Sequence, residues 1–345
     1  MAKFKTLKGE TMVSILGEHG KAVLYFHHFG DRYIREVKTD IDIDTDGKVL
    51  AVGAGDWKSI AERIDFINPS EMFVSTVDRQ LMLHLDDTKE ANTFEISVYH
   101  DFDLEMFDTS ECSSKIGVDF LKKIKASRPF VSKDDTRYFM QVFHFTADGA
   151  CVATDARIMS VIKGDRDFCK WFCDRTTKKD VRECGNIFAE VFDCFDGKHD
   201  ITVSVSCNGV WLKLTDGKVT VYTKTDAEVS FPNWAHVIPD TKDYAEKTMT
   251  NMSKFTDKKL LKVLKQYHYK VCITNGVAHT VDDINLFEVG EVLNDYTMNA
   301  EYLSAIAGLL GDSVTCSFNP ENNQKCVVYG DLHGDFVLVM PMQKY

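Results

Sequence analysis

Residues 337–345 read V-L-V-M-P-M-Q-K-Y, and the interpretation of the whole sequence starts from this stretch. Val337, Leu338 and Val339 form an apolar run that is typical of a β-strand. Pro341 ends strand pairing, because proline has no amide hydrogen to donate and its φ angle is fixed. Met340 and Met342 flank the proline with flexible thioethers, which adapt to partners of different shape. The stretch therefore predicts either a closing edge strand or a strand whose end lines a binding surface.

The overall composition limits the classes of protein that fit the sequence. A chain of 345 residues holds about two to three domains. Its hydrophobic content of 44% is ordinary for a globular protein with a sizeable core. The net charge of −12 argues against a protein that coats nucleic acid through its overall charge. Local basic faces are still compatible with it, because field strength depends on how charges cluster.

The cysteines indicate reduced thiols and no metal or other cofactor. Ten cysteines are scattered along the chain, without a C-x-x-C pair. The tightest group, Cys169, Cys173, Cys184 and Cys194 with His199 nearby, matches none of the standard zinc spacings. We find no signal peptide and no apolar run long enough to span a membrane. A cytoplasmic protein with buried thiols is therefore expected.

Helical and strand patterns predict an α+β fold built from three similar units. The second and third units each read as a helix, a group of strands, another helix and more strands, whereas the first has only one clear helix. Lys163–Glu183 is a polar, cysteine-bearing stretch to which we assign no helix or strand. We place the units at 1–112, 113–240 and 241–345, with helices at Asp56–Phe66, Val118–Ser127, Gly185–Phe195, Thr256–Gln266 and Asn299–Leu310.

Gly330–Asp335, G-D-L-H-G-D, is the strongest candidate for an enzyme motif. It resembles the first metal-binding signature of calcineurin-like phosphatases, which need several further His, Asp or Asn ligands to hold two metals. None of these residue types follows Asp335, so we predict a tight turn with free φ angles at Gly330 and Gly334. We expect no catalytic and no metal-binding residues, and a metallophosphatase remains the alternative from another class.

Two expected helices carry lysines on one face. Lys254, Lys258, Lys262 and Lys265 fall within an arc of about 80° around the helix expected near Thr256–Gln266. Lys122, Lys123 and Lys125 form a similar cluster in the opening helix of the second unit. Solvated faces are one explanation. Because the same lysine arrangement recurs in an acidic chain, we favour a second explanation, in which the lysines contact nucleic-acid phosphates without reading the base sequence.

Three stretches resemble the bacterial DNA polymerase sliding clamp, the beta subunit of DNA polymerase III. Lys133–Val161 is similar to the middle-domain stretch with the segments R-Y-Y-L and A-T-D-G-H-R-L. Phe231–Pro239, F-P-N-W-A-H-V-I-P, is similar to F-P-D-Y-R-R-V-L-P, and Val339–Met342 resembles the family's tail. The resemblance is good from about Val118 onward and weak before it. A first unit that differs this much from the bacterial family suits a virus-encoded clamp.

The resemblance implies a ring without enzymatic activity. Two chains of three domains would pair head to tail as a homodimer around double-stranded DNA, with sheets outside and helices inside. Such a clamp tethers a DNA polymerase, is opened by a clamp loader, and binds partners through a short Q-L-x-L-F type motif. A clamp-fold module that binds partners without closing a ring is the alternative.

The resemblance also places the site residues. Around the partner-peptide pocket it implies Met140, Thr154, Ala156, Arg157, Ile158, Met159, Pro232, His236, Val237, Leu338, Val339, Met340, Pro341 and Met342. Near the DNA path it implies Arg137 and Tyr138, beside the lysines already named. The family's G-H-R-L is Ala156-Arg157-Ile158-Met159 here, so a different motif preference is expected. Neither Gly185–Phe195 nor Asn299–Leu310 carries Lys or Arg, and the first unit lacks much of its opening helix.

Overall fold

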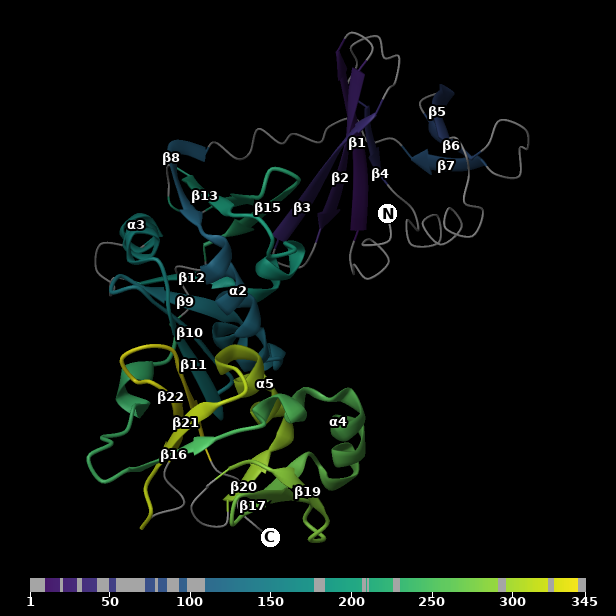
Figure 1. Ribbon diagram of the computed structural model, residues 1–345. Coiled ribbons are helices and arrows are strands. Elements are labelled where there is room, and N and C mark those ends of the chain that lie inside the picture. Colours follow the sequence, from purple (N-terminus) through teal and green to yellow (C-terminus); the bar gives the residue numbers. More distant parts are fainter. Residues whose placement is uncertain are drawn as a thin grey trace. The chain divides into compact units, whose positions relative to one another are not determined.

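A computed structural model describes most of the chain from residue 109 onward and the strands before it (Figure 1). Packing divides the chain into two compact units. The first comprises 1–113, 194–196 and 201–224, and the second comprises 114–193, 197–200 and 225–345. The helix expected at Asp56–Phe66 lies outside the described residues, which are 10–18, 21–29, 33–41, 50–53, 72–77, 80–85, 93–97, 109–176, 184–206, 209, 211–225, 230–290, 296–321 and 326–340.

An eight-stranded antiparallel sheet organises the first unit. Its order is β4-β1-β2-β3-β15-β14-β13-β8, so β3 and β15 join two groups of strands that are far apart in sequence. A separate sheet has the order β5-β6-β7. The strands are β1 (Glu10–Glu18), β2 (Lys21–Phe29), β3 (Tyr33–Ile41), β4 (Leu50–Gly53), β5 (Met72–Val77), β6 (Gln80–Leu85), β7 (Thr93–Ser97), β8 (Thr109–Ile116), β13 (Ile201–Ser206), β14 (Trp211–Thr215) and β15 (Val219–Lys224).

A second eight-stranded sheet organises the second unit, in the order β12-β9-β10-β11-β23-β22-β21-β16. The strand predicted at 337–339 is β23, and it lies inside the sheet and not at its edge. The strands are β9 (Val142–Thr146), β10 (Ala150–Thr154), β11 (Ile158–Lys163), β12 (Cys184–Phe188), β16 (Ala245–Met249), β21 (Val314–Phe318), β22 (Val327–Gly330) and β23 (Phe336–Val339).

One strand order recurs three times in the described chain. A four-stranded sheet contains β17 (Lys270–Thr274), β18 (Val277–His279), β19 (Asn285–Glu288) and β20 (Tyr296–Asn299), in the order β19-β18-β17-β20. A three-strand meander with the fourth strand beside the first thus appears as β20-β17-β18-β19, β12-β9-β10-β11 and β4-β1-β2-β3. This recurrence agrees with the threefold repeat. The division at residues 112 and 240 stays a prediction.

Three of the predicted helices are present in the second unit. Helix α2 (Val118–Ala126) buries Phe120, Leu121 and Ile124, the apolar side expected from its sequence. Helix α5 (Ala300–Leu310) begins at Asn299, whose side chain accepts the Glu301 amide at 2.8 Å. The helix predicted at Thr256–Gln266 is shorter. Its α-helical part is α4 (Lys258–Leu264), between the 3₁₀ segments η8 (Met252–Thr256) and η9 (Lys265–Tyr267).

The helix predicted at Gly185–Phe195 is wrong. Its first part pairs with β9 as β12 (Cys184–Phe188), and a 3₁₀ segment, η6 (Ala189–Cys194), follows. Asn186 explains the strand, because its side chain accepts a 2.8 Å hydrogen bond from His144 of β9. Three further 3₁₀ segments are η4 (Arg128–Phe130), η5 (Asp135–Met140) and η7 (Trp234–Val237).

The polar stretch Lys163–Glu183, for which no element was predicted, contains a helix. Helix α3 (Arg166–Thr176) begins after Asp165, whose carboxylate accepts the Asp167 and Phe168 amides at 2.9 and 3.1 Å. Its buried residues are Phe168, Cys169, Phe172, Cys173 and Thr176. The two cysteines complete the apolar face, and the helix was missed because charged residues dominate the rest of the stretch. None of the described helices is long and apolar enough to cross a membrane.

We predict that His144 makes the fold sensitive to acid. His144 is buried, it stacks on Phe231 with ring centroids 4.4 Å apart, and its burial lowers its pKa despite the hydrogen bond with Asn186. Below the ordinary pKa of about 6.5 the unfolded chain takes up a proton that the folded chain resists. The free energy of unfolding should therefore decrease as the pH falls below ~6.5, by at most ~1.4 kcal/mol per pH unit from this group.

Urea unfolding of the wild type and H144Q at pH 7.5 and 5.5 measures the effect. Glutamine keeps a donor for Asn186 but does not titrate in this range. We expect the wild type to lose more stability on acidification than H144Q does. An equal loss in both proteins would contradict the assignment.

Candidate functional site

An apolar pocket lies in the second unit, beside the junction of β11 and β23. Its volume is about 210 Å³. Strand ends, a tight turn and the η7 segment all contribute to it. The lining residues are Met140, Thr154, Ala156, Arg157, Ile158, Met159, Pro232, Asn233, Trp234, Val237, Cys326, Leu338, Val339 and Met340.

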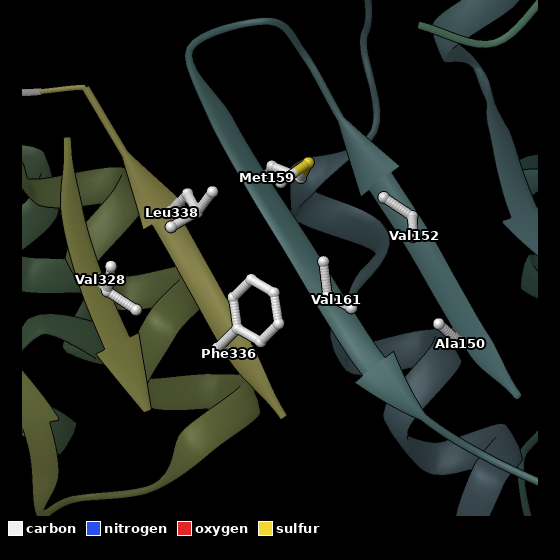
Figure 2. Close-up of a cluster of buried hydrophobic side chains, with 7 residues drawn as sticks. All are labelled: Ala150, Val152, Met159, Val161, Val328, Phe336 and Leu338. Carbon is white, nitrogen blue, oxygen red and sulfur yellow. The ribbon is translucent and has the colours of Figure 1, made fainter. Parts of the chain in front are cut away.

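The floor of the pocket is part of the packed core. Met159 of β11 lies opposite Leu338 of β23 in the antiparallel register, and both are at least 95% buried. Figure 2 shows these two side chains next to each other across the junction. They belong to one hydrophobic cluster with Ala150, Val152, Val161, Val328 and Phe336. Because this cluster is close-packed, the floor is rigid before any ligand arrives.

A hydrogen-bonded turn between β10 and β11 forms one rim. The Thr154 hydroxyl accepts the Ala156 amide at 3.0 Å and donates to the Ile158 carbonyl at 2.9 Å. The Asp155 carboxylate accepts the amides of Arg157 and Ile158 at 2.8 and 2.9 Å. Ala156 has a φ of 76°, a left-handed conformation that costs a non-glycine residue roughly 1–2 kcal/mol. The hydrogen bonds hold the turn in this conformation.

The segment 230–239 forms the opposite wall without joining the sheet. Phe231, Trp234 and Ile238 pack against the core cluster, and Phe231 also stacks on His144. These contacts leave Val237 58% exposed. The wall is therefore apolar and is fixed by aromatic packing.

Polar contacts tie the rim turn to two other elements. The Tyr302 hydroxyl of α5 donates to the Asp155 carboxylate at 3.4 Å, and Arg137 of η5 donates to the Asp155 carbonyl at 3.3 Å. Burial raises the pKa of Tyr302, the Asp155 charge adds to the rise, and the Arg157 charge opposes it. Arg157 itself is exposed at the rim.

The structure brings most of the residues implied by the resemblance to this pocket. His236 is not among the lining residues. It is exposed, and one ring nitrogen lies 3.2 Å from the Asn233 amide nitrogen. Pro341 and Met342 lie outside the described residues. Sequence reasoning missed Asn233, Trp234 and Cys326. The first two sit between Pro232 and Val237, so the local pattern offered a signal, whereas Cys326 arrives by tertiary packing alone.

The lysines of the two candidate basic faces differ in their surroundings. On α2, Lys123 forms a 2.7 Å ion pair with Asp335, and Lys125 donates to the Phe192 carbonyl at 3.0 Å. Lys122 lies 3.4 Å from Asp119. Around α4, Lys258, Lys262 and Lys265 are all exposed, and none has an ion pair among the described residues.

Lys254, the remaining lysine of the α4 face, and Tyr138, the other candidate DNA contact, are exposed as well. Lys254 lies over the Phe287 ring at 5.2 Å. Tyr138 is 52% exposed and meets Phe139 edge to face. The basic face around α4 is thus more accessible than the one on α2.

The G-D-L-H-G-D stretch forms a turn between β22 and β23, as predicted. Gly330 has a φ of 92°, but Gly334 has no left-handed φ angle, so that part of the prediction is wrong. Asp335 accepts the Lys163 amide at 2.7 Å in addition to its ion pair with Lys123. Over the described ranges, no group of three or more His, Cys, Asp or Glu residues could hold a metal ion.

Comparison with solved structures assigns the fold. A DNA polymerase sliding clamp from Pseudomonas aeruginosa matches with a TM-score of 0.67 at 13% identity, over 96% of this chain and 92% of the other. DNA polymerase III subunit beta from Borrelia burgdorferi, in complex with a natural product, matches with 0.68 at 11% identity, over 97% and 91%. The Helicobacter pylori beta clamp bound to a DNA ligase peptide matches with 0.67 at 13% identity, over 96% and 91%.

At these identities the likeness establishes the fold and nothing further. The chain has the α+β fold of the bacterial sliding clamps, as its sequence predicted. No protein-family model and no curated protein matches the sequence.

The pocket geometry predicts that Cys326 reacts faster than the buried cysteines. Cys326 is half-buried in the pocket lining, whereas Cys316 is buried and its pKa is raised to about 12, mainly by desolvation. Because the thiolate is the reactive form, iodoacetamide should label Cys326 about tenfold faster or more. Peptide mapping by mass spectrometry measures both sites in one sample. Equal labelling rates at the two sites would contradict the pocket geometry.

Proposed function

We propose that this chain is a DNA sliding clamp, which closes a ring with a second copy around duplex DNA and tethers a DNA polymerase and other partners through the apolar pocket. The observation that carries the proposal is the pocket at the β11–β23 junction of a clamp fold. A clamp of this kind makes and breaks no covalent bond. It therefore needs no catalytic residue and no cofactor.

The pocket suits a short peptide with apolar anchors. Its methionines, Met140, Met159 and Met340, present flexible thioethers to an incoming side chain. A rigid floor and two fixed walls limit the ordering cost of binding, which favours short motifs. The Helicobacter pylori neighbour is bound to a DNA ligase peptide. We expect a Q-L-x-L-F type peptide to occupy the pocket here, with its Leu and Phe side chains as anchors.

The strand order supports ring closure by two chains. Within the chain, the third strands of two meanders pair with each other. β3 of β1-β2-β3 pairs with β15 of β13-β14-β15, and β11 of β9-β10-β11 pairs with β23 of β21-β22-β23. The third strands of the meanders β17-β18-β19 and β5-β6-β7 have no such partner among the described strands, so β19 and β7 are open sheet edges. If third strands also pair between two copies of the chain, β19 of each chain pairs with β7 of the other. Two such contacts close a head-to-tail ring.

The basic face around α4 supports DNA binding without sequence preference. Lysines contact phosphates as point charges, so such binding is independent of base sequence and weakens as salt increases. The acidic remainder of the chain opposes tight binding, which suits a protein that slides. A closed ring also needs a clamp loader to reach circular DNA, and this partner follows from the proposed ring.

Two alternatives make different predictions. A clamp-fold module that binds partners without closing a ring would keep the pocket but stay monomeric. A metallophosphatase would bind metal and hydrolyse phosphate esters. Metal analysis of the purified protein and a phosphatase assay distinguish this last class from the other two.

We predict that M340A weakens peptide binding about tenfold without unfolding the chain. Met340 lines the pocket and is 52% exposed, so its loss removes contact area for the ligand and little core packing. Fluorescence anisotropy with labelled Gln-Leu-Ala-Leu-Phe measures the dissociation constant. V263A is the matched control, because Val263 is 51% exposed on α4 and does not line the pocket. The pocket assignment fails if M340A and V263A bind the peptide equally well.

We predict that the wild-type chain is a dimer of twice the 39.2 kDa chain mass. Ile284 is 55% exposed immediately before β19, and a lysine there opposes strand addition at this edge. Light scattering after size exclusion at micromolar concentration should give dimers for the wild type and V263K, and monomers for I284K. A monomeric wild type would favour the module that does not close a ring.

A further inference from the structure

We propose that the pocket selects partner peptides that carry an acidic side chain beside their apolar anchors, and that Arg157 is the residue that selects it. The inference rests on the proposed peptide-binding function and specifies the chemistry of the partner. Arg157 acts here as a specificity-determining residue.

Among the described residues that line the pocket, Arg157 alone has a charged side chain. Its neighbours there are apolar, apart from the neutral polar groups of Thr154, Asn233 and Cys326. None of the described lining residues carries a carboxylate, so a peptide held by its apolar side chains meets the positive charge of Arg157. A nearby carboxylate on the peptide would gain a charge-assisted hydrogen bond in a partly desolvated setting.

The backbone of Arg157 is fixed on both sides. Its amide donates to the Asp155 carboxylate at 2.8 Å, and its carbonyl accepts the Met340 amide at 3.0 Å. The preceding residue, Ala156, is held in the left-handed conformation. The side chain therefore starts from a defined point on the rim, which reduces the ordering cost of an ion pair with a ligand.

The positive charge of Arg157 has no carboxylate partner among the described residues. Arg137 has one, in Asp134 at 3.6 Å, whereas the ion pairs between described side chains do not include Arg157. Its guanidinium contacts the Tyr302 hydroxyl, which in turn donates to Asp155. An arginine has five N–H donors in a planar fork, so the contact with Tyr302 orients the group and leaves donors for a ligand.

Peptide pairs that differ only in charge test this inference. The probes are labelled, C-terminally amidated Gln-Leu-Ala-Leu-Phe peptides with Asp or its isostere Asn before Gln, between the leucines, or after Phe. We expect the wild type to bind the Asp peptide ~5-fold more tightly at one of the three positions, because an ion pair between exposed charged groups contributes up to about this much. The preference should decrease as salt increases.

Three variants assign the preference to Arg157. R157Q should bind the Asp and Asn peptides equally, and R157E should prefer a Lys peptide at the same position. R166Q, which replaces an exposed arginine of α3 that does not line the pocket, should keep the preference for Asp. Thermal unfolding checks that each variant is folded.

The outcomes separate the two proposals. If no peptide of the series binds the wild type, the proposed function fails and this inference fails with it. If the peptides bind but Asp and Asn are equivalent, or if R157Q keeps the preference, only this inference is overturned. A preference for a free C-terminal carboxylate over internal Asp would likewise overturn it, because the selected group would then be the peptide terminus.

Discussion

The antiparallel pairing of β11 with β23 is the interaction on which the described second unit depends. It joins residues 158–163 to residues 336–339, and so makes one sheet from two distant parts of the chain. Met159 and Leu338 face each other across it, and the core cluster forms around them. A register shift of one residue would turn both side chains to the other face of the sheet. The same pairing brings the rim turn and Met340 together, so the pocket exists only where these strands meet.

The two faces of this sheet have separate roles. Phe120 of α2 and Phe168 and Phe172 of α3 surround Phe145 on one face. The segment with Phe231, Trp234 and Ile238 covers the core cluster on the other face. The pocket lining includes Met159, Leu338 and Trp234, so the pocket lies on the side of the sheet that this segment covers.

Local sequence patterns predicted most of the fold, and tertiary contacts account for the rest. Helices α2 and α5 follow from apolar spacing and, for α5, from the cap at Asn299. Helix α3 was missed because charged residues dominate the rest of its stretch, and β12 was predicted as a helix because its pairing with β9 is not visible locally. The pocket residues of the rim turn were named from the resemblance of Lys133–Val161 to the sliding-clamp stretch, and not from a local pattern. Cys326 reaches the pocket only through the pairing of distant strands.

The central claim is that the pairing rule seen within the chain also operates between chains and closes a ring. Electron microscopy of the purified full-length protein tests this claim most directly. The account predicts class averages of a closed ring with a central hole and six similar domains, two chains contributing three each. Open arcs, or particles of a single chain at concentrations where partner peptides bind, would contradict it.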